Sequence, residues 1–262
     1  MDAAALIAQA GLAMSLRFCD WSRRRWTLTL LSSLLVPPVP AQDAALRPVR
    51  VVLVSSKIGI AGAQAFQFKL VRLDLQAGKT AQWSGENGFL YVLRGVCEVE
   101  AGSERRKLEE NDALFIDAIS AFAVRAVGAK PAVLLHYRLV PANAPDRFVY
   151  PASVMASELY SGNETIPGLS AGPHELSLTR VSSPVGAPPP PMHQRSGAAL
   201  YYLLSGKGTL HMQGKDAAHS AGDVQFEPYG FVHTWENTGA VPLIFLQANI
   251  SREGVPEILW QR

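Results

Sequence analysis

The chain carries one residue pattern twice, at an offset of 111 residues. The segments FLYVLRG and LYYLLSG align without a gap, and so do VGAKPAVLL and TGAVPLIFL. The shared positions include Gly95 with Gly206, Gly128 with Gly239, and Pro131 with Pro242. Because glycine and proline set the course of the backbone, the repeat indicates duplicated turns and therefore two copies of one folded unit.

Each copy consists of short apolar stretches separated by turn residues. In the first copy we expect strands at 65–75, 89–93, 97–100, 113–116 and 132–139, and in the second at 175–181, 200–204, 209–212, 224–227 and 243–249. The alternation in AFQFKLVRLDL and the lack of a long helical period predict an all-β fold of two antiparallel barrels or jelly rolls. Residues 51–54 are expected to add a strand to an edge or to the partner copy.

The second copy contains two motifs that carry a family resemblance. The segment GDVQFEPYGFVHTWEN has the spacing G-x5-P-x-G-x2-H-x3-N, formed by Gly222, Pro228, Gly230, His233 and Asn237. This resembles the second motif of the cupin superfamily at all five positions. The preceding segment resembles the first cupin motif, H-x-H-x3-E-x6-G, with His193 and Gly206 in place, Arg195 at the second histidine and Ala199 at the glutamate.

The resemblance implies a bicupin, with two tandem cupin β-barrels (double-stranded β-helix or jelly roll). Together with the N-terminal leader, the resemblance divides the chain into five parts. Residues 1–41 are the leader, 42–64 an N-terminal arm, 65–140 a degenerate first barrel, 141–173 a connector, and 174–262 a second barrel with a C-terminal tail. We expect a helical turn in the connector at SVMASELY, and we expect His174, His211 and His219 to face solvent.

The altered ligand set leaves three functions open. A guanidinium has no lone pair for a metal ion, so Arg195 favours a binding module for a small anionic or sugar-like ligand, walled by Tyr201, Tyr229 and Trp235. Alternatively, His193 and His233 hold one divalent metal (iron, manganese, zinc or nickel) in a dioxygenase, decarboxylase or isomerase. The third alternative is a structural remnant without a ligand, so the residues do not decide whether the chain is an enzyme.

The first copy differs at every ligand position. The offset places Gln82, Ser84, Gly88 and Phe122 where the family has its metal ligands, so we expect no metal there. Glu227 precedes the P-x-G turn of the second copy, but its direction is not fixed by the sequence.

The N-terminal stretch predicts export. Arg23 to Arg25 precede the apolar segment WTLTLLSSLLV and a small-residue cleavage site before Gln42. The expected mature chain carries 20 basic and 20 acidic residues, and this balance excludes a nucleic-acid partner. We also expect no membrane span once the leader is cleaved. It contains one cysteine, Cys97, expected to be packed and inert. We expect a periplasmic protein with a small-molecule ligand, and the sequence leaves a homo-oligomer open.

Overall fold

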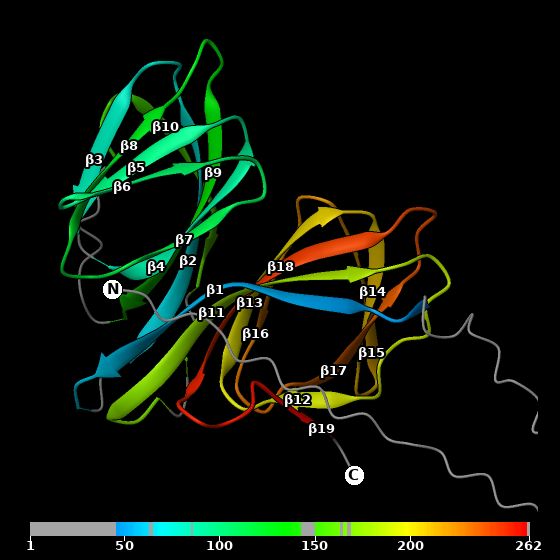
Figure 1. The fold of residues 1–262 in the computed structure, drawn as a ribbon. Coiled ribbons are helices and arrows are strands. Elements are labelled where there is room, and N and C mark those ends of the chain that lie inside the picture. Colours follow the sequence, from blue (N-terminus) through cyan, green and yellow to red (C-terminus); the bar gives the residue numbers. More distant parts are fainter. Residues whose placement is uncertain are drawn as a thin grey trace, which may run out of the picture. The chain divides into compact units, whose positions relative to one another are not determined.

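The structure is a computed structural model that describes residues 46–62, 65–84, 86–142, 150–162, 165–166 and 169–260. The elements in these ranges are β-strands (Figure 1). No helix within them is long and apolar enough to cross a bilayer. The leader expected at residues 1–41 lies outside the described residues. Because the elements in the described ranges are strands, the all-β prediction is confirmed.

The first barrel consists of two antiparallel sheets. One sheet has the order β10-β2-β9-β4-β7, formed by Val154–Ser161, Phe66–Leu75, Ala132–Pro141, Asn87–Arg94 and Ala113–Ile116. The other has the order β3-β8-β5-β6, formed by Thr80–Ser84, Ala121–Ala126, Cys97–Ala101 and Glu104–Leu108. Their facing sides enclose an apolar cluster that includes Leu90, Ile116, Phe122 and Val124.

The second barrel repeats this plan with one additional strand. Its first sheet has the order β1-β11-β18-β13-β16, formed by Val49–Ile60, Gly172–Ser183, Leu243–Arg252, Ala198–Ser205 and Val224–Glu227. Its second sheet has the order β15-β14-β17-β12-β19, formed by Lys215–Ser220, Lys207–Met212, Val232–Asn237, His193–Arg195 and Ile258–Trp260. The first barrel's sheet has no counterpart of β19 among the described residues, and β19 lies beside β12.

The N-terminal strand completes the second barrel rather than the first. β1 pairs with β11 along its whole length, from Val49 opposite Ser182 to Ile60 opposite Gly172. β10 takes the corresponding edge of the first barrel, where it pairs with β2 (Figure 1). The expected addition of an N-terminal strand to the partner copy is thus confirmed. This arrangement brings residues near position 50 to the second barrel.

The helical turn expected at SVMASELY is wrong. These residues form most of β10, an edge strand whose backbone groups pair with β2. Helix-forming residues such as Met155, Ala156 and Glu158 occupy it, so hydrogen bonding along the sheet edge overrides their local preference.

The duplicated glycines have a common structural role. Gly95 and Gly206 have φ angles of +85° and +82°. A Cβ atom at Gly95 would lie 2.8 Å from the carbonyl oxygen of Pro131, and one at Gly206 would lie 2.6 Å from that of Pro242. The backbone conformation and the close carbonyl both require glycine, which explains why glycine occurs at both positions.

In the first barrel, the positions that correspond to the metal ligands hold exposed or packed side chains. Gln82 and Ser84 are exposed, while Phe122 packs edge-on against Trp83 with ring centroids 4.8 Å apart. Cys97 is buried, and burial raises the pKa of its thiol to about 12. The prediction that the thiol is packed is confirmed, and its raised pKa supports the prediction that it is inert.

Candidate functional site

Two histidines face each other inside the second barrel. His193 on β12 and His233 on β17 are paired across the sheet, with ring centroids 4.5 Å apart. The Nδ1 atoms lie 3.0 Å from the carbonyl oxygens of Pro191 and Phe231, respectively. Since a carbonyl only accepts, the Nδ1 atom of each ring carries a proton. Burial lowers the pKa of His193 to about 4, so this imidazole is neutral at pH 7.

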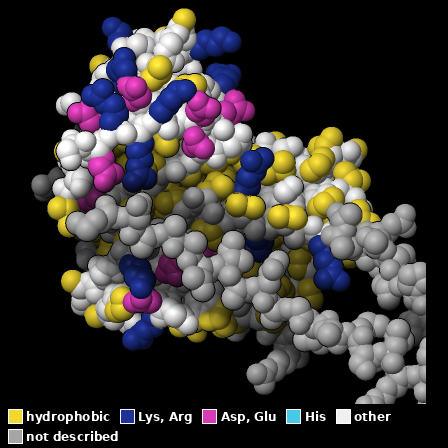
Figure 2. Space-filling view, in the orientation of Figure 1, with side chains coloured by type: hydrophobic (Ala, Val, Ile, Leu, Met, Phe, Trp, Pro, Cys, Tyr) yellow, Lys and Arg dark blue, Asp and Glu magenta, His cyan; other side chains and the backbone are white. Residues whose placement is uncertain are grey.

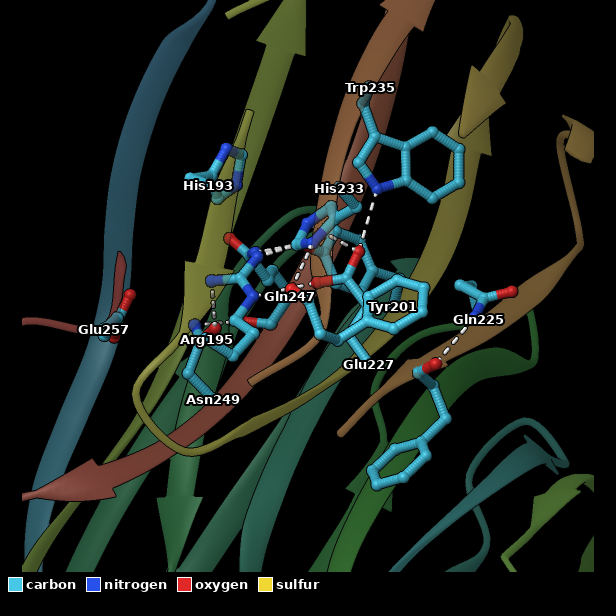
Figure 3. Close-up of polar contacts among 12 residues, drawn as sticks. His193, Arg195, Tyr201, Gln225, Glu227, His233, Trp235, Gln247, Asn249 and Glu257 are labelled. Carbon is cyan, nitrogen blue, oxygen red and sulfur yellow. Dashed lines mark hydrogen bonds and ion pairs between the residues drawn. The ribbon is translucent and has the colours of Figure 1, made fainter. Parts of the chain in front are cut away.

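A buried ion pair lies beside the histidines. Arg195 donates from Nε to Glu227 Oε2 at 2.8 Å, and the side chains are 2% and 0% exposed (Figure 3). Burial alone would lower the pKa of Arg195, but Tyr201 and Glu227 outweigh burial and raise it. Burial alone would raise the pKa of Glu227, but Arg195 and His233 lower it to about 2. Both groups are therefore charged at neutral pH.

The carboxylate reaches the site from a strand that the motif does not use. Glu227 on β16 is the direct partner of Ala199 on β13, the position at which the family motif places its glutamate. A carboxylate thus lies on the neighbouring strand, in register with the position of the motif's glutamate. The sequence could not identify this carboxylate, because pairing between β13 and β16 is a tertiary relation.

Both carboxylate oxygens of Glu227 face other site residues. Trp235 donates from Nε1 to Oε1 at 3.0 Å. His233 Nε2 is also 3.0 Å from Oε1, yet this nitrogen makes no hydrogen bond within the described residues. The Nε2 atom of His233 therefore lies within ion-pair distance of the carboxylate, which agrees with the lowered pKa of Glu227.

The arrangement does not fit the divalent metal that the fold family implies. Among the residues that the structure describes, no three His, Cys, Asp or Glu side chains are grouped to hold an ion. One oxygen of Glu227 is bound by Arg195, and the guanidinium lies where a ligand should converge. The permanent positive charge of Arg195 would repel a nearby cation.

The ion pair belongs to a closed ring of hydrogen bonds that joins strands from both ends of the chain. Arg195 also donates to Tyr201 and to Asn249. Gln247 donates to Tyr201, and Asn249 donates to Ser177. Ser177 donates to Glu257, which pairs with Arg50 at 3.1 Å. Arg50 on β1 closes the ring by donating to Gln247 at 2.9 Å. Such a network fixes the side chains in one arrangement.

A cavity of about 450 Å³ opens beside this ring. Its polar and charged lining residues are Arg47, Arg50, His193, Arg195, Tyr201 and Gln247. The remaining wall is apolar and comprises Pro48, Val181, Pro188, Pro189, Pro190, Pro191, Trp235, Phe245, Ile258 and Trp260. Three guanidinium groups line the cavity, and no carboxylate does among its described lining residues.

The structure brings most of the predicted site residues together. His193, Arg195, Tyr201 and Trp235 line the cavity, and His233 lies buried next to them. Tyr229 does not join them: its side chain is 57% exposed and borders a separate small depression. The reason is that Tyr229 lies in the turn between β16 and β17.

The expectation that the other histidines face solvent is wrong for His174 and His219. The His219 side chain is only 13% exposed, because its ring packs against Trp235 with centroids 5.1 Å apart. His174 is buried on β11, and its Nδ1 lies 3.2 Å from the carbonyl oxygen of Gly172. It was expected in solvent because it adjoins the connector, but β1 covers it by pairing along β11. His211 remains partly exposed between Asp216 and Glu236.

The contribution of the N-terminal segment to the cavity has no signal in the sequence. Arg47, Pro48 and Arg50 line a cavity whose other lining residues are more than 130 positions later in the chain. Figure 2 shows Lys and Arg side chains on the surface among apolar ones on the visible face. No local signal assigns Arg50 to the second barrel.

Comparisons with known proteins agree with this architecture. Residues 179–248 match a family model described as a cupin domain. A curated relative, an oxalate-binding protein of Thermotoga maritima, is 45% identical over 56 residues, which is 21% of this chain and 46% of the relative. The match thus spans about half of that relative's length.

Solved structures show the same fold over most of the chain. Oxalate decarboxylase of Bacillus subtilis, described for its Mn(II) centres, matches with a TM-score of 0.52 and 14% identity over 80% of this chain and 78% of its own. A formate complex of Lactobacillus farciminis oxalate decarboxylase matches with a TM-score of 0.54 and 12% identity over 80% and 88%. At this identity the likeness concerns the fold alone.

Proposed function

The chain belongs to the cupin superfamily as a protein with two tandem barrels, and we propose that its second barrel binds a small anionic ligand without a metal. One observation carries this proposal: among the described residues that line the cavity beside the histidines, three carry a guanidinium group and none carries a carboxylate. A guanidinium recognises carboxylate oxygens through paired hydrogen bonds and stays charged at every physiological pH.

The internal ion pair sets the role of each arginine. Arg195 is almost fully buried and bound to Glu227, so it supplies a fixed charge at the base of the site. Arg50 keeps 37% of its side chain accessible and uses two of its five N–H groups in the bonds to Gln247 and Glu257. Arg50 is therefore the better placed to contact a ligand. The name of the Thermotoga relative supports a carboxylate as the first ligand to test.

A metal-dependent enzyme is the second candidate. It is favoured by the Nε2 lone pair of the neutral His193 and by the Glu227 oxygen 3.0 Å from His233. It requires Arg195 to leave the carboxylate, which the burial of the pair opposes. We further propose that the leader expected at residues 1–41 exports the protein to the periplasm.

The test combines metal analysis with calorimetry. The purified protein would be loaded separately with manganese, iron, zinc and nickel, dialysed, and analysed for bound metal. It would then be titrated with oxalate and with acetate. We expect metal far below one equivalent, and saturable anion binding that raises the melting temperature with ligand concentration.

Two variants separate the cavity from general effects of charge. Arg50→Gln should weaken anion binding about tenfold, whereas Arg125→Gln, which breaks an exposed ion pair with Glu98 in the first barrel, should leave it unchanged. Stoichiometric metal in the wild type, lost in His193→Ala and His233→Ala, would replace this proposal with the enzyme.

A further inference from the structure

The cavity has a charged part and an apolar part. Arg47 and Arg50 come from the segment that leads into and begins β1, whereas Pro188 to Pro191 and Trp260 form an apolar wall. The relative's oxalate has no apolar surface to contact such a wall. A cavity of about 450 Å³ lies in the range that holds ligands much larger than a two-carbon acid.

We propose that the ligand is a monocarboxylate with an aromatic or similarly flat apolar body, held by Arg47 and Arg50 at its carboxylate and by Trp260 and the proline run at its body. This inference rests on the proposed function and specifies its ligand class. It assigns the C-terminal strand β19 and the N-terminal segment before β1 to one binding site.

The charges around the cavity favour a single negative charge. Glu227 pairs with Arg195, and Glu257 pairs with Arg50. Arg47 is exposed, and within the described part of the chain no ion pair involves it. One positive charge is therefore left over beside the cavity. A monocarboxylate neutralises this charge, whereas a dianion would bring a second, unpaired charge against an apolar wall, which costs free energy.

The apolar wall is fixed before any ligand binds. The carbonyl of Pro190 accepts a hydrogen bond from Thr234 Oγ1 at 2.7 Å, and that of Pro191 accepts one from His193 Nδ1 at 3.0 Å. Proline has little backbone freedom to lose. The run from Pro188 to Pro191 is thus a rigid surface, and such preorganisation lowers the entropic cost of binding.

Trp260 provides a flat surface that the fold leaves open. It lies opposite His193 in the β12–β19 pair, with ring centroids 5.2 Å apart at 61°. Its side chain is nevertheless 57% exposed, and it lines the cavity. An exposed indole beside a cationic group is suited to stack on an aromatic ring whose carboxylate reaches the cation.

The test compares four probes by calorimetry on the intact protein: phenylacetate, its neutral analogue phenylacetamide, acetate and oxalate. We expect phenylacetate to bind at least tenfold more tightly than each of the other three. Phenylacetate should also quench tryptophan fluorescence in a saturable manner.

Variants assign each end of the ligand to its residues. Arg47→Gln should weaken phenylacetate about tenfold, whereas Arg94→Gln, at an exposed arginine of the first barrel, should not. Trp260→Ala should weaken phenylacetate about tenfold and leave acetate unchanged, and Trp260→Phe should restore most of the loss.

The outcomes distinguish this inference from the proposed function. Oxalate or acetate bound as tightly as phenylacetate, or a Trp260→Ala variant with unchanged phenylacetate affinity, would overturn the inference and leave anion binding in place. Tighter binding of phenylacetamide than of phenylacetate would also overturn it. If none of the three anions binds, both the inference and the proposed function are wrong.

Discussion

Replacing Glu227 with glutamine should destabilise the second barrel strongly. The substitution keeps the shape of the side chain but leaves the guanidinium of Arg195 buried without a counter-charge. The two groups are 2.8 Å apart and are 2% and 0% exposed, and breaking such a pair from one side costs about 3–5 kcal/mol.

A second route gives a similar magnitude. The pKa of Glu227 falls from its ordinary value of 4.5 to about 2, and each pKa unit of such a shift corresponds to about 1.4 kcal/mol. The carboxylate therefore contributes about 3 kcal/mol. Because its pKa is lowered in the folded state, this contribution is present above pH 4.5 and is lost as the pH falls through about 2.

Urea unfolding followed by tryptophan fluorescence measures the loss. With a slope of about 2 kcal/mol per molar urea, the midpoint should fall by about 1.5–2.5 M. Arg138→Met is the matched control, since Arg138 is a buried arginine paired with Glu86 at 2.6 Å in the first barrel. It should destabilise the chain without changing anion binding.

The double variant isolates the charge. Arg195→Met/Glu227→Gln removes both ions, so it should be more stable than Glu227→Gln alone although it carries one more substitution. A loss below about 1 kcal/mol in Glu227→Gln, the range of exposed ion pairs, would refute the buried pair. Equal losses in the single and double variants would show that the unpaired charge is not what destabilises the protein.

Three further changes have clear expected outcomes. Arg195→His would place a third imidazole beside the two histidines and should produce stoichiometric Mn(II) or Zn(II) binding by metal analysis; no gain would mean that this position does not converge on the site. Gly95→Ala and Gly206→Ala should each lower stability by about 1–3 kcal/mol in urea titrations, and by more than Gly214→Ala, where φ is +74° but no atom lies within 4 Å. Burial lowers the pKa of His136 to about 3, so the free energy of unfolding should fall as the pH drops from 6.5 towards 3. His136→Phe should flatten that decline, and an unchanged pH profile in this variant would show that His136 does not cause it.

Much of the fold followed from local patterns. The strand expected at 113–116 is β7, and the one expected at 224–227 is β16, with identical bounds. The offset of 111 residues reappears between these two strands and between the strands Asn87–Arg94 and Ala198–Ser205. These elements were predictable because turn residues and apolar runs act over a few neighbouring positions.

Two strands, β12 and β10, were harder to predict. β12 has three residues, His193–Arg195, and it follows a proline run that gives no alternation to detect. β10 carries helix-forming residues and is a strand only because β2 offers its edge. In both cases the partner strand, and not the segment itself, stabilises the extended backbone.

The repeat and the motif spacing were enough to identify two copies of one β-unit and to assign His193, Arg195 and His233 to the second. They also revealed a guanidinium at the position of an imidazole, because residue identity and motif spacing are local properties. The pairing of Glu227 with Ala199 and its neutralisation of Arg195 became visible in the folded chain, since they depend on the register between strands. Folding also brings Arg50 to the cavity, because strand pairing is set by hydrogen bonds between segments far apart in the chain.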